Sequence, residues 1–215
     1  MNKKFEFTGE TKAILGNTLH RIRALISFGE VGAGELGGWI EKEENLDASG
    51  NAWVYGNAWV FDNARVDGDA CVDGDACVYG DAWVSGNARV SGNARVYGDA
   101  RVSGNAWVYG DAWVFGNAWV FGDARVDGDA RVYKCGAIFW ISNVGSRDDT
   151  ATFFACRDKK IKVIVGCFFG DLDEFAAAVQ KTHGDNTHAK VYRLAIEMAK
   201  ERIKMDDMPE ESNDG

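Results

Sequence analysis

Residues 54–65 read VYGNAW-VFDNAR, which is two copies of one six-residue phrase. The phrase recurs without a break from residue 48 to residue 133, and its general form is Val-x-Gly-[Asn/Asp]-Ala-x. A short fixed period is typical of a solenoid, in which each copy stacks on its neighbours. The repeat therefore decides the fold of this region before any local propensity is considered.

The phrase predicts a short strand followed by a corner. An α-helix is excluded, because its 3.6 residues per turn would place Val on every face. Ala and Val lie two positions apart, so they point to the same side of an extended strand. Gly and Asn/Asp follow, and both tolerate the positive φ of a tight corner. Three six-residue phrases then make a coil of eighteen residues around a three-sided column, with Val and Ala inside.

This phrase resembles the repeat of hexapeptide-repeat proteins, which form left-handed parallel β-helices. The left-handed crossover and the triangular prism are what the resemblance implies; the period itself does not specify the hand. The predicted fold class is mainly β: a left-handed parallel β-helix with a small N-terminal β cap and a C-terminal α+β module. About fourteen phrases would give nearly five coils, or roughly 23 Å of column at the usual strand spacing.

The two variable positions of each phrase face outward in this prediction, and residues eighteen apart stack in ladders along the column. One coil carries arginine on all three faces and the next carries tryptophan: Arg89, Arg95 and Arg101, then Trp107, Trp113 and Trp119. If subunits bring an arginine of one chain against a tryptophan of another, the pair suits a phosphate-bearing base. These six residues are the candidate ligand-binding set. The alternative is that they form self-satisfied stacks within one chain.

Another ladder is aromatic at every rung: Phe61, Tyr79, Tyr97, Phe115 and Tyr133. A continuous exposed aromatic strip usually marks a contact surface. We therefore expect a subunit interface here, most simply in a homotrimer. The alternative is that stacking between coils only stabilises a bare sheet face.

The chain divides into four predicted segments: an N-terminal β cap at 1–46, the repeats at 47–133, an α+β module at 134–205 and an acidic, disordered tail at 206–215. In the cap we expect strands at 3–7 and 19–28, with a glycine-rich loop at 29–38. In the module we expect strands at 137–143, 150–156 and 161–167, then helices at about 172–183 and 187–205. Asp171 and Glu174 suit a capping box at the first helix. The second helix should bury one stripe: Val191, Leu194, Ala195, Met198 and Ile203.

The flanks of the repeats resemble a group of small phage and prophage proteins, described as hexapeptide-repeat or polymer-forming-like. The segments that carry this resemblance are AGELGGWIEKEENL at 33–46, SNVGS at 142–146, GCFFG at 166–170 and THGDN at 182–186. The resemblance implies a phage or prophage origin and action in the cytoplasm of a bacterial host. It assigns no chemistry to these segments.

Composition narrows the function classes. The formal net charge is −9, and an acidic column argues against direct binding to DNA or RNA. No signal peptide or membrane span is expected. The five cysteines include no CxxC pair, which indicates reduced thiols and neither a disulfide framework nor a metal site. No cofactor is expected.

One polar cluster of the C-terminal module is a second place to look for chemistry: Asn143, Ser146, Arg147, Cys167, His183, Asp185, Asn186 and His188. Cys167 and His183 could act as nucleophile and base. The favoured interpretation is structural, with Cys167 ending a buried strand and His183 at a helix C-terminus, where a cation is favoured.

Three function classes remain. Acyltransferases of this fold use a histidine base, and its carbonic anhydrases use three histidine ligands, but the repeats contain no histidine. We therefore assign no catalytic residue. The preferred function is a non-enzymatic homotrimer of phage type that binds and inhibits a host factor, or sequesters a nucleotide signal of host defence. A structural protein of a phage particle and, less favoured, an acyltransferase-like enzyme are the alternatives.

Overall fold

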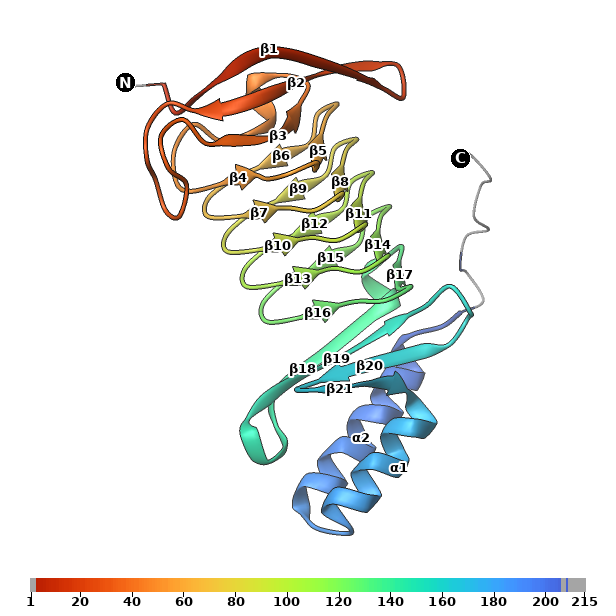
Figure 1. Ribbon diagram of the computed structural model, residues 1–215. Helices are drawn as coiled ribbons and strands as arrows, with labels where there is room; N and C mark the ends of the chain where they lie inside the picture. The colour runs from red at the N-terminus through yellow and green to blue at the C-terminus, as the bar shows by residue number, and fades with distance from the viewer. Residues whose placement is uncertain (1–2, 206–207, 209–215) are drawn as a thin grey trace.

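A computed structural model describes residues 3–205 and Met208. It is an elongated column, with the coils of a solenoid in the middle (Figure 1). N-terminal strands lie across one end, and an antiparallel sheet with two helices lies at the other. The tail predicted at 206–215 lies outside the described residues, except for Met208.

The solenoid consists of two-residue strands, each ending in the Val of one phrase. These strands are β4 (Trp53–Val54), β5 (Trp59–Val60), β6 (Arg65–Val66), β7 (Cys71–Val72), β8 (Cys77–Val78), β9 (Trp83–Val84), β10 (Arg89–Val90), β11 (Arg95–Val96), β12 (Arg101–Val102), β13 (Trp107–Val108), β14 (Trp113–Val114), β15 (Trp119–Val120), β16 (Arg125–Val126) and β17 (Arg131–Val132). Strands β4 to β14 each pair in parallel with the strand three further along the chain, as Val90 of β10 does with Val108 of β13. Three strands per coil give about five turns.

Three parallel sheets run along the column. Their orders are β5-β8-β11-β14-β17, β4-β7-β10-β13-β16 and β6-β9-β12-β15. Every Val of a solenoid strand, and every Ala before one, is 0% exposed from Ala52 to Val132. The predicted eighteen-residue coil, with Val and Ala inside, is thus confirmed. Burying each Val contributes about 1.5 kcal/mol or more, and the column forms one continuous core.

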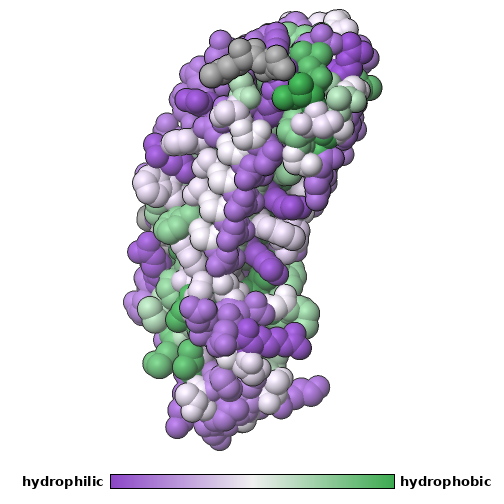
Figure 2. All heavy atoms as spheres, turned by 90° about the vertical axis from the view of Figure 1, so that its left-hand side faces the viewer, coloured by the Kyte–Doolittle hydropathy of each residue, from purple (hydrophilic) through white to green (hydrophobic). Residues whose placement is uncertain are grey.

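The corners explain the second half of the phrase. The glycines have positive φ, as at Gly92 with φ +72°, and glycines eighteen residues apart stack closely, as Gly92 does on Gly110. Next to them, the amides of Asn87 and Asn105 each donate a hydrogen bond to the side chain eighteen residues further on, at 3.1 and 2.9 Å. Figure 2 shows one face of the column, where hydrophilic side chains run along its length and hydrophobic ones form small separate patches.

The N-terminal segment extends one sheet of the solenoid. β1 (Phe5–Ile14), β2 (Asn17–Ala24) and β3 (Leu36–Ile40) are antiparallel, and β3 then pairs in parallel with β5. A 3-10 turn, η1 (Glu43–Asn45), follows. The strand predicted at 3–7 is too short, and the predicted loop at 29–38 is too long. Gly37 and Gly38 belong to β3, where a Cβ would approach other atoms to 2.6 Å.

One outward tryptophan differs from the prediction. Trp53 is 0% exposed, because Phe5 and Phe28 of the N-terminal segment pack edge-on against its ring. Its position in the phrase still points away from the Val column. The first coil is therefore covered from outside, which the repeat pattern alone does not reveal.

The C-terminal segment packs on the last coil. Its elements are η2 (Cys135–Ala137), β18 (Ile138–Val144), η3 (Gly145–Arg147), β19 (Asp149–Ala155), β20 (Ile161–Val165), β21 (Phe168–Asp171), α1 (Leu172–His183) and α2 (Thr187–Arg202). β18-β19-β20-β21 form an antiparallel sheet. The Thr152 hydroxyl accepts a hydrogen bond from the Arg125 N–H, and Ala130 bridges to Cys156. The end of the solenoid thus gains hydrogen-bond partners.

Two predictions for this segment need correction. β21 was not predicted, because Phe168-Phe169-Gly170 is too short a run to read as a strand without its partner β20. Of the predicted stripe on α2, Leu194 and Met198 are 65% and 53% exposed. The helix instead buries Ala189, Tyr192, Ala195, Ile196 and Ala199. The predicted capping box of Asp171 and Glu174 is confirmed.

Candidate functional site

The arginine and tryptophan candidates form three separate stacks, one on each sheet. Within the single chain, guanidinium carbons lie over indole rings at 5.6 Å for Arg89–Trp107, 5.0 Å for Arg95–Trp113 and 5.2 Å for Arg101–Trp119. The six residues therefore do not make one site. Each arginine already stacks on its tryptophan within one chain, without a neighbouring subunit.

The Arg101 face forms a groove of about 300 Å³. Its guanidinium lies between two indoles, 5.6 Å from the ring of Trp83 and 5.2 Å from that of Trp119. Trp83, Trp119 and Phe121 are 40%, 47% and 45% exposed. The hydroxyls of Ser85 and Ser103 complete the lining. We call these six residues the Arg101 groove.

The charge in the Arg101 groove is available to a ligand. Among residues 3–205, the Arg101 side chain makes no hydrogen bond or ion pair, so all its N–H donors are free. A guanidinium held by two rings is positioned without using those donors. Trp83 donates its indole N–H to Asp67 at 2.8 Å, which fixes that ring. The groove thus offers fixed aromatic plates, a positive charge and two hydroxyls.

The Arg89 face is less suited to an anion. Its cavity of about 370 Å³ is lined by Arg89 and Trp107 but also by the carboxylates of Glu30 and Asp73. Burial, the largest cause, raises the pKa of Tyr55 in this cavity to about 12. The phenol is therefore neutral at pH 7, and the two carboxylates oppose a second anion.

The Arg95 face is closed by its neighbours. Trp113 lies under two guanidinium groups, with Arg131 4.3 Å from its ring centroid. Arg131 is buried and donates to the backbone carbonyls of Asp111 and Ala130. The ring of Tyr97 meets Trp113 edge-on. The contact between Arg131 and Trp113 packs the last two coils against each other. It leaves little of the Arg95 face open to a ligand.

The aromatic ladder is stacked, but it is not exposed along its whole length. Ring centroids are 5.1 Å apart for Phe61–Tyr79, 4.9 Å for Tyr79–Tyr97 and 5.1 Å for Tyr97–Phe115, with planes within 8°. Phe61 and Tyr133 are only 2% and 7% exposed. The N-terminal segment covers Phe61, and the Tyr133 hydroxyl donates to the Lys204 carbonyl. The expected continuous strip is therefore wrong at both ends.

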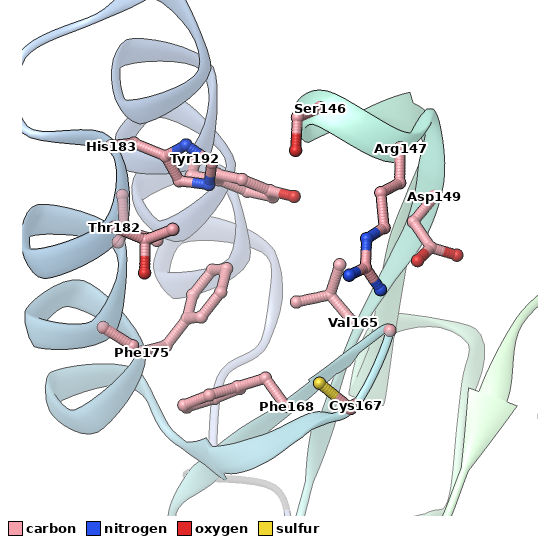
Figure 3. A pocket seen from close by; sticks show the side chains of 13 residues that line it. Ser146, Arg147, Asp149, Val165, Cys167, Phe168, Phe175, Thr182, His183 and Tyr192 are labelled. Carbon is pink, nitrogen blue, oxygen red and sulfur yellow. The ribbon is translucent and has the colours of Figure 1, made fainter.

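Four of the eight polar candidates in the C-terminal segment line one cavity of about 410 Å³: Ser146, Arg147, Cys167 and His183. Cys167 lies in the exposed turn after β20, so the expectation that it ends a buried strand is wrong. Figure 3 shows the Cys167 thiol and the His183 ring on opposite sides of the cavity. They share no hydrogen bond among the described residues, so they are not arranged as nucleophile and base.

The other four polar candidates have structural roles or lie elsewhere. Asn186 is the N-cap of α2 and accepts from the Ala189 N–H. Asp185 pairs with Arg193 at 2.9 Å. Asn143 has a positive φ near the end of β18, and His188 lies outside the cavity lining, with its ring 5.7 Å from that of His183 and tilted by 54°.

Sequence reasoning did not recognise that the exposed Trp83 and Phe121 and the half-buried Trp140 belong to one aromatic group. Trp83 and Phe121 lie on the ladders that contain Arg101 and Ser103, so the eighteen-residue spacing was the available signal. Trp140 meets Phe121 edge-on at 4.5 Å. It comes from β18, outside the repeats, so no pattern placed it there.

A family model described as the YdcK beta solenoid repeat matches four overlapping windows of the chain, residues 82–98, 88–104, 94–110 and 100–116. Their starts are six residues apart, which is the period of the phrase. The chain is therefore similar to β-solenoid repeat proteins over the middle of its column, which includes Arg101. No curated protein matches the chain.

No described helix combines the length and the apolar character needed to cross a bilayer. Among the described residues, no group of three or more His, Cys, Asp or Glu side chains is placed to hold a metal ion.

Proposed function

We propose that this protein is a non-enzymatic binding protein whose Arg101 groove takes a phosphate-bearing aromatic ligand. The observation that carries the proposal is the guanidinium of Arg101, held between Trp83 and Trp119 with its donors free. Arginine donors match phosphate oxygens, and exposed indoles stack on bases. A nucleotide signal of host defence has both groups, and sequestering it is the function we favour over inhibition of a host protein.

The finer features of the fold belong to the same proposal. The solenoid is a left-handed triangular prism of the hexapeptide-repeat type, encoded by a phage or prophage and acting in the host cytoplasm. The fixed six-residue period and the eighteen-residue register support the prism. The phrases that flank the repeats support the phage origin.

A homotrimer is the proposed assembly. Only the middle of the aromatic ladder, Tyr79, Tyr97 and Phe115, retains partial exposure for a partner. Sedimentation velocity should show a trimer, and Tyr97→Arg should shift it towards the monomer. A wild-type protein that sediments as a monomer at micromolar concentration would remove the trimer and leave the groove of one chain intact.

The ligand is tested by titration calorimetry with cyclic dinucleotides and cyclic ADP-ribose species. Wild-type protein should bind at least one of them, and Arg101→Gln should weaken that binding by about tenfold or more, because a charged hydrogen bond is lost. Arg125→Gln is the matched control, since Arg125 is also exposed and stacks on Trp107 on a different sheet. If none of these compounds produces heat, the nucleotide function is wrong.

The alternative of a structural part of a phage particle rests on the rigid elongated column. Detection of the protein in purified particles would favour it. Detection only in lysates of infected cells would favour the binding function. An acyltransferase-like activity remains the least favoured alternative.

A further inference from the structure

Three segments far apart in the sequence meet at the cavity between the C-terminal sheet and helices α1 and α2 (Figure 3). Residues 146–149 come from η3 and the start of β19, 165–168 from the end of β20, the turn after it and the start of β21, and 182–183 from the end of α1. The volume of about 410 Å³ lies in the range of small-molecule sites. None of these segments contributes to the solenoid.

One wall of the cavity is apolar. Phe175 and Val179 are successive buried residues on one face of α1, and Phe168 packs on Phe175 with ring centroids 5.1 Å apart. Val165 and Ala178 complete this wall. It can bury an aliphatic or aromatic group of a ligand, at about 25 cal/mol for each Å² removed from water.

A phenol without a hydrogen-bond partner among the described residues lies beside this wall: the ring of Tyr192 meets that of Phe175 edge-on at 5.3 Å. Tyr192 is 7% exposed, and its hydroxyl makes no hydrogen bond to any described residue. Figure 3 shows this hydroxyl directed towards Ser146. Gly145 has φ +76°, and a Cβ there would lie 2.0 Å from the Tyr192 oxygen. The absent side chain at Gly145 thus gives the phenol its place at the cavity.

Two opposite charges flank the cavity without pairing. Within residues 3–205, Arg147 and Asp149 make no ion pair with each other or with another side chain. Figure 3 shows both groups at the same side of the cavity. Arg193 does not compete for a ligand, because it bonds to Gln180, the Gly184 carbonyl and Asp185.

We propose that this cavity binds a small zwitterion with an apolar group, that is, an apolar α-amino acid. Arg147 and the Tyr192 hydroxyl donate hydrogen bonds to the ligand carboxylate. Asp149 accepts from its ammonium group, and Phe168, Phe175 and Val179 bury its side chain. A ligand with only one charge leaves Arg147 or Asp149 without a partner. This site is independent of the Arg101 groove.

Titration calorimetry with L-phenylalanine and L-leucine tests the proposal on the full chain. At least one should bind, while 3-phenylpropionate and phenethylamine, which each lack one charged group, should bind at least tenfold more weakly than L-phenylalanine. Arg147→Met should weaken amino-acid binding by about tenfold or more. Lys190→Met removes an exposed cation of α2 outside the lining and should change nothing.

Ala178→Leu provides a second test that does not remove a charge. It should fill part of the cavity and abolish binding while leaving the circular dichroism spectrum unchanged. The proposal is overturned if neither amino acid binds at millimolar concentration, or if 3-phenylpropionate binds as tightly as L-phenylalanine. Unchanged affinity in folded Arg147→Met would also overturn it.

Discussion

The stacked corner glycines provide a sharp test of the solenoid. Gly56 and Gly74 occupy the same corner of successive coils, and both have positive φ, +56° and +71°. A Cβ on Gly74 would lie 3.0 Å from both the N and O atoms of Gly92. A Cβ on Gly56 would find its nearest atoms at 3.6 Å, which is an ordinary contact. The two glycines therefore differ in the space available for a Cβ, but both have positive φ.

The expected costs follow from these distances. Either glycine replaced by alanine places a Cβ in the left-handed region, at a cost of about 1–2 kcal/mol. Reduced freedom of the unfolded chain offsets about 0.4–1 kcal/mol, equally in both variants. Gly74→Ala adds a contact with fixed backbone, and such overpacking costs about 1–3 kcal/mol more. We expect Gly74→Ala to lower the free energy of unfolding by that extra amount relative to Gly56→Ala.

Urea unfolding followed by circular dichroism measures the difference. Equal m-values in the two variants would allow their midpoints to be compared directly. Asp62 occupies the glycine position of another corner and has φ +55°. A side chain is therefore tolerated at a corner with positive φ where there is space for its Cβ. If Gly74→Ala is as stable as Gly56→Ala, the close stacking of the corners is wrong.

Three further predictions concern other parts of the chain. Iodoacetamide at pH 8 should alkylate the exposed Cys135 and Cys167 rapidly, whereas the buried Cys77 and Cys156 should react only after unfolding, as measured by mass spectrometry. Burial also raises the pKa of Cys77 to about 12, which keeps it a thiol at this pH. Equal labelling of all four cysteines in the folded protein would contradict the prediction. Burial lowers the pKa of Lys4 to about 8 from 10.5, so between these values the unfolded chain holds more protons and stability rises with pH. The difference in unfolding free energy between wild type and Lys4→Met should therefore grow in favour of the wild type from pH 8 to 10.5, and a flat difference would refute the burial of this amine. Asp171→Ala removes the N-cap of α1 and should cost about 1 kcal/mol in thermal unfolding, with Asp173→Ala, in the same turn, as the control.

The six-residue period was enough to predict where the Arg–Trp pairs lie. It did not show which of the three pairs remains open to a ligand. The spacing of eighteen placed Arg101 beside Trp119 and in line with Trp83. The three Arg–Trp pairs looked equivalent in the sequence. They differ because carboxylates lie beside Arg89 and because the buried Arg131 clamps Trp113.

The C-terminal cavity was less accessible to sequence reasoning. Of the eight polar residues that the sequence analysis grouped together, four line this cavity and the other four do not. Tyr192 was not among them, and the predicted buried stripe of the second helix did not include it either, although the structure buries it. Only the packing of α2 against Gly145 gives its hydroxyl a place at the cavity.

The sequence by itself determined the solenoid, because each six-residue phrase carries its own strand, corner and inward side chains. Such local information repeats regardless of what lies at the ends of the column. Tertiary structure alone decided which outward side chains remain accessible. Trp53, Phe61 and Tyr133 are buried where segments outside the repeats pack on them. The physical reason is that burial of an outward residue depends on contacts with distant segments, which no local period encodes.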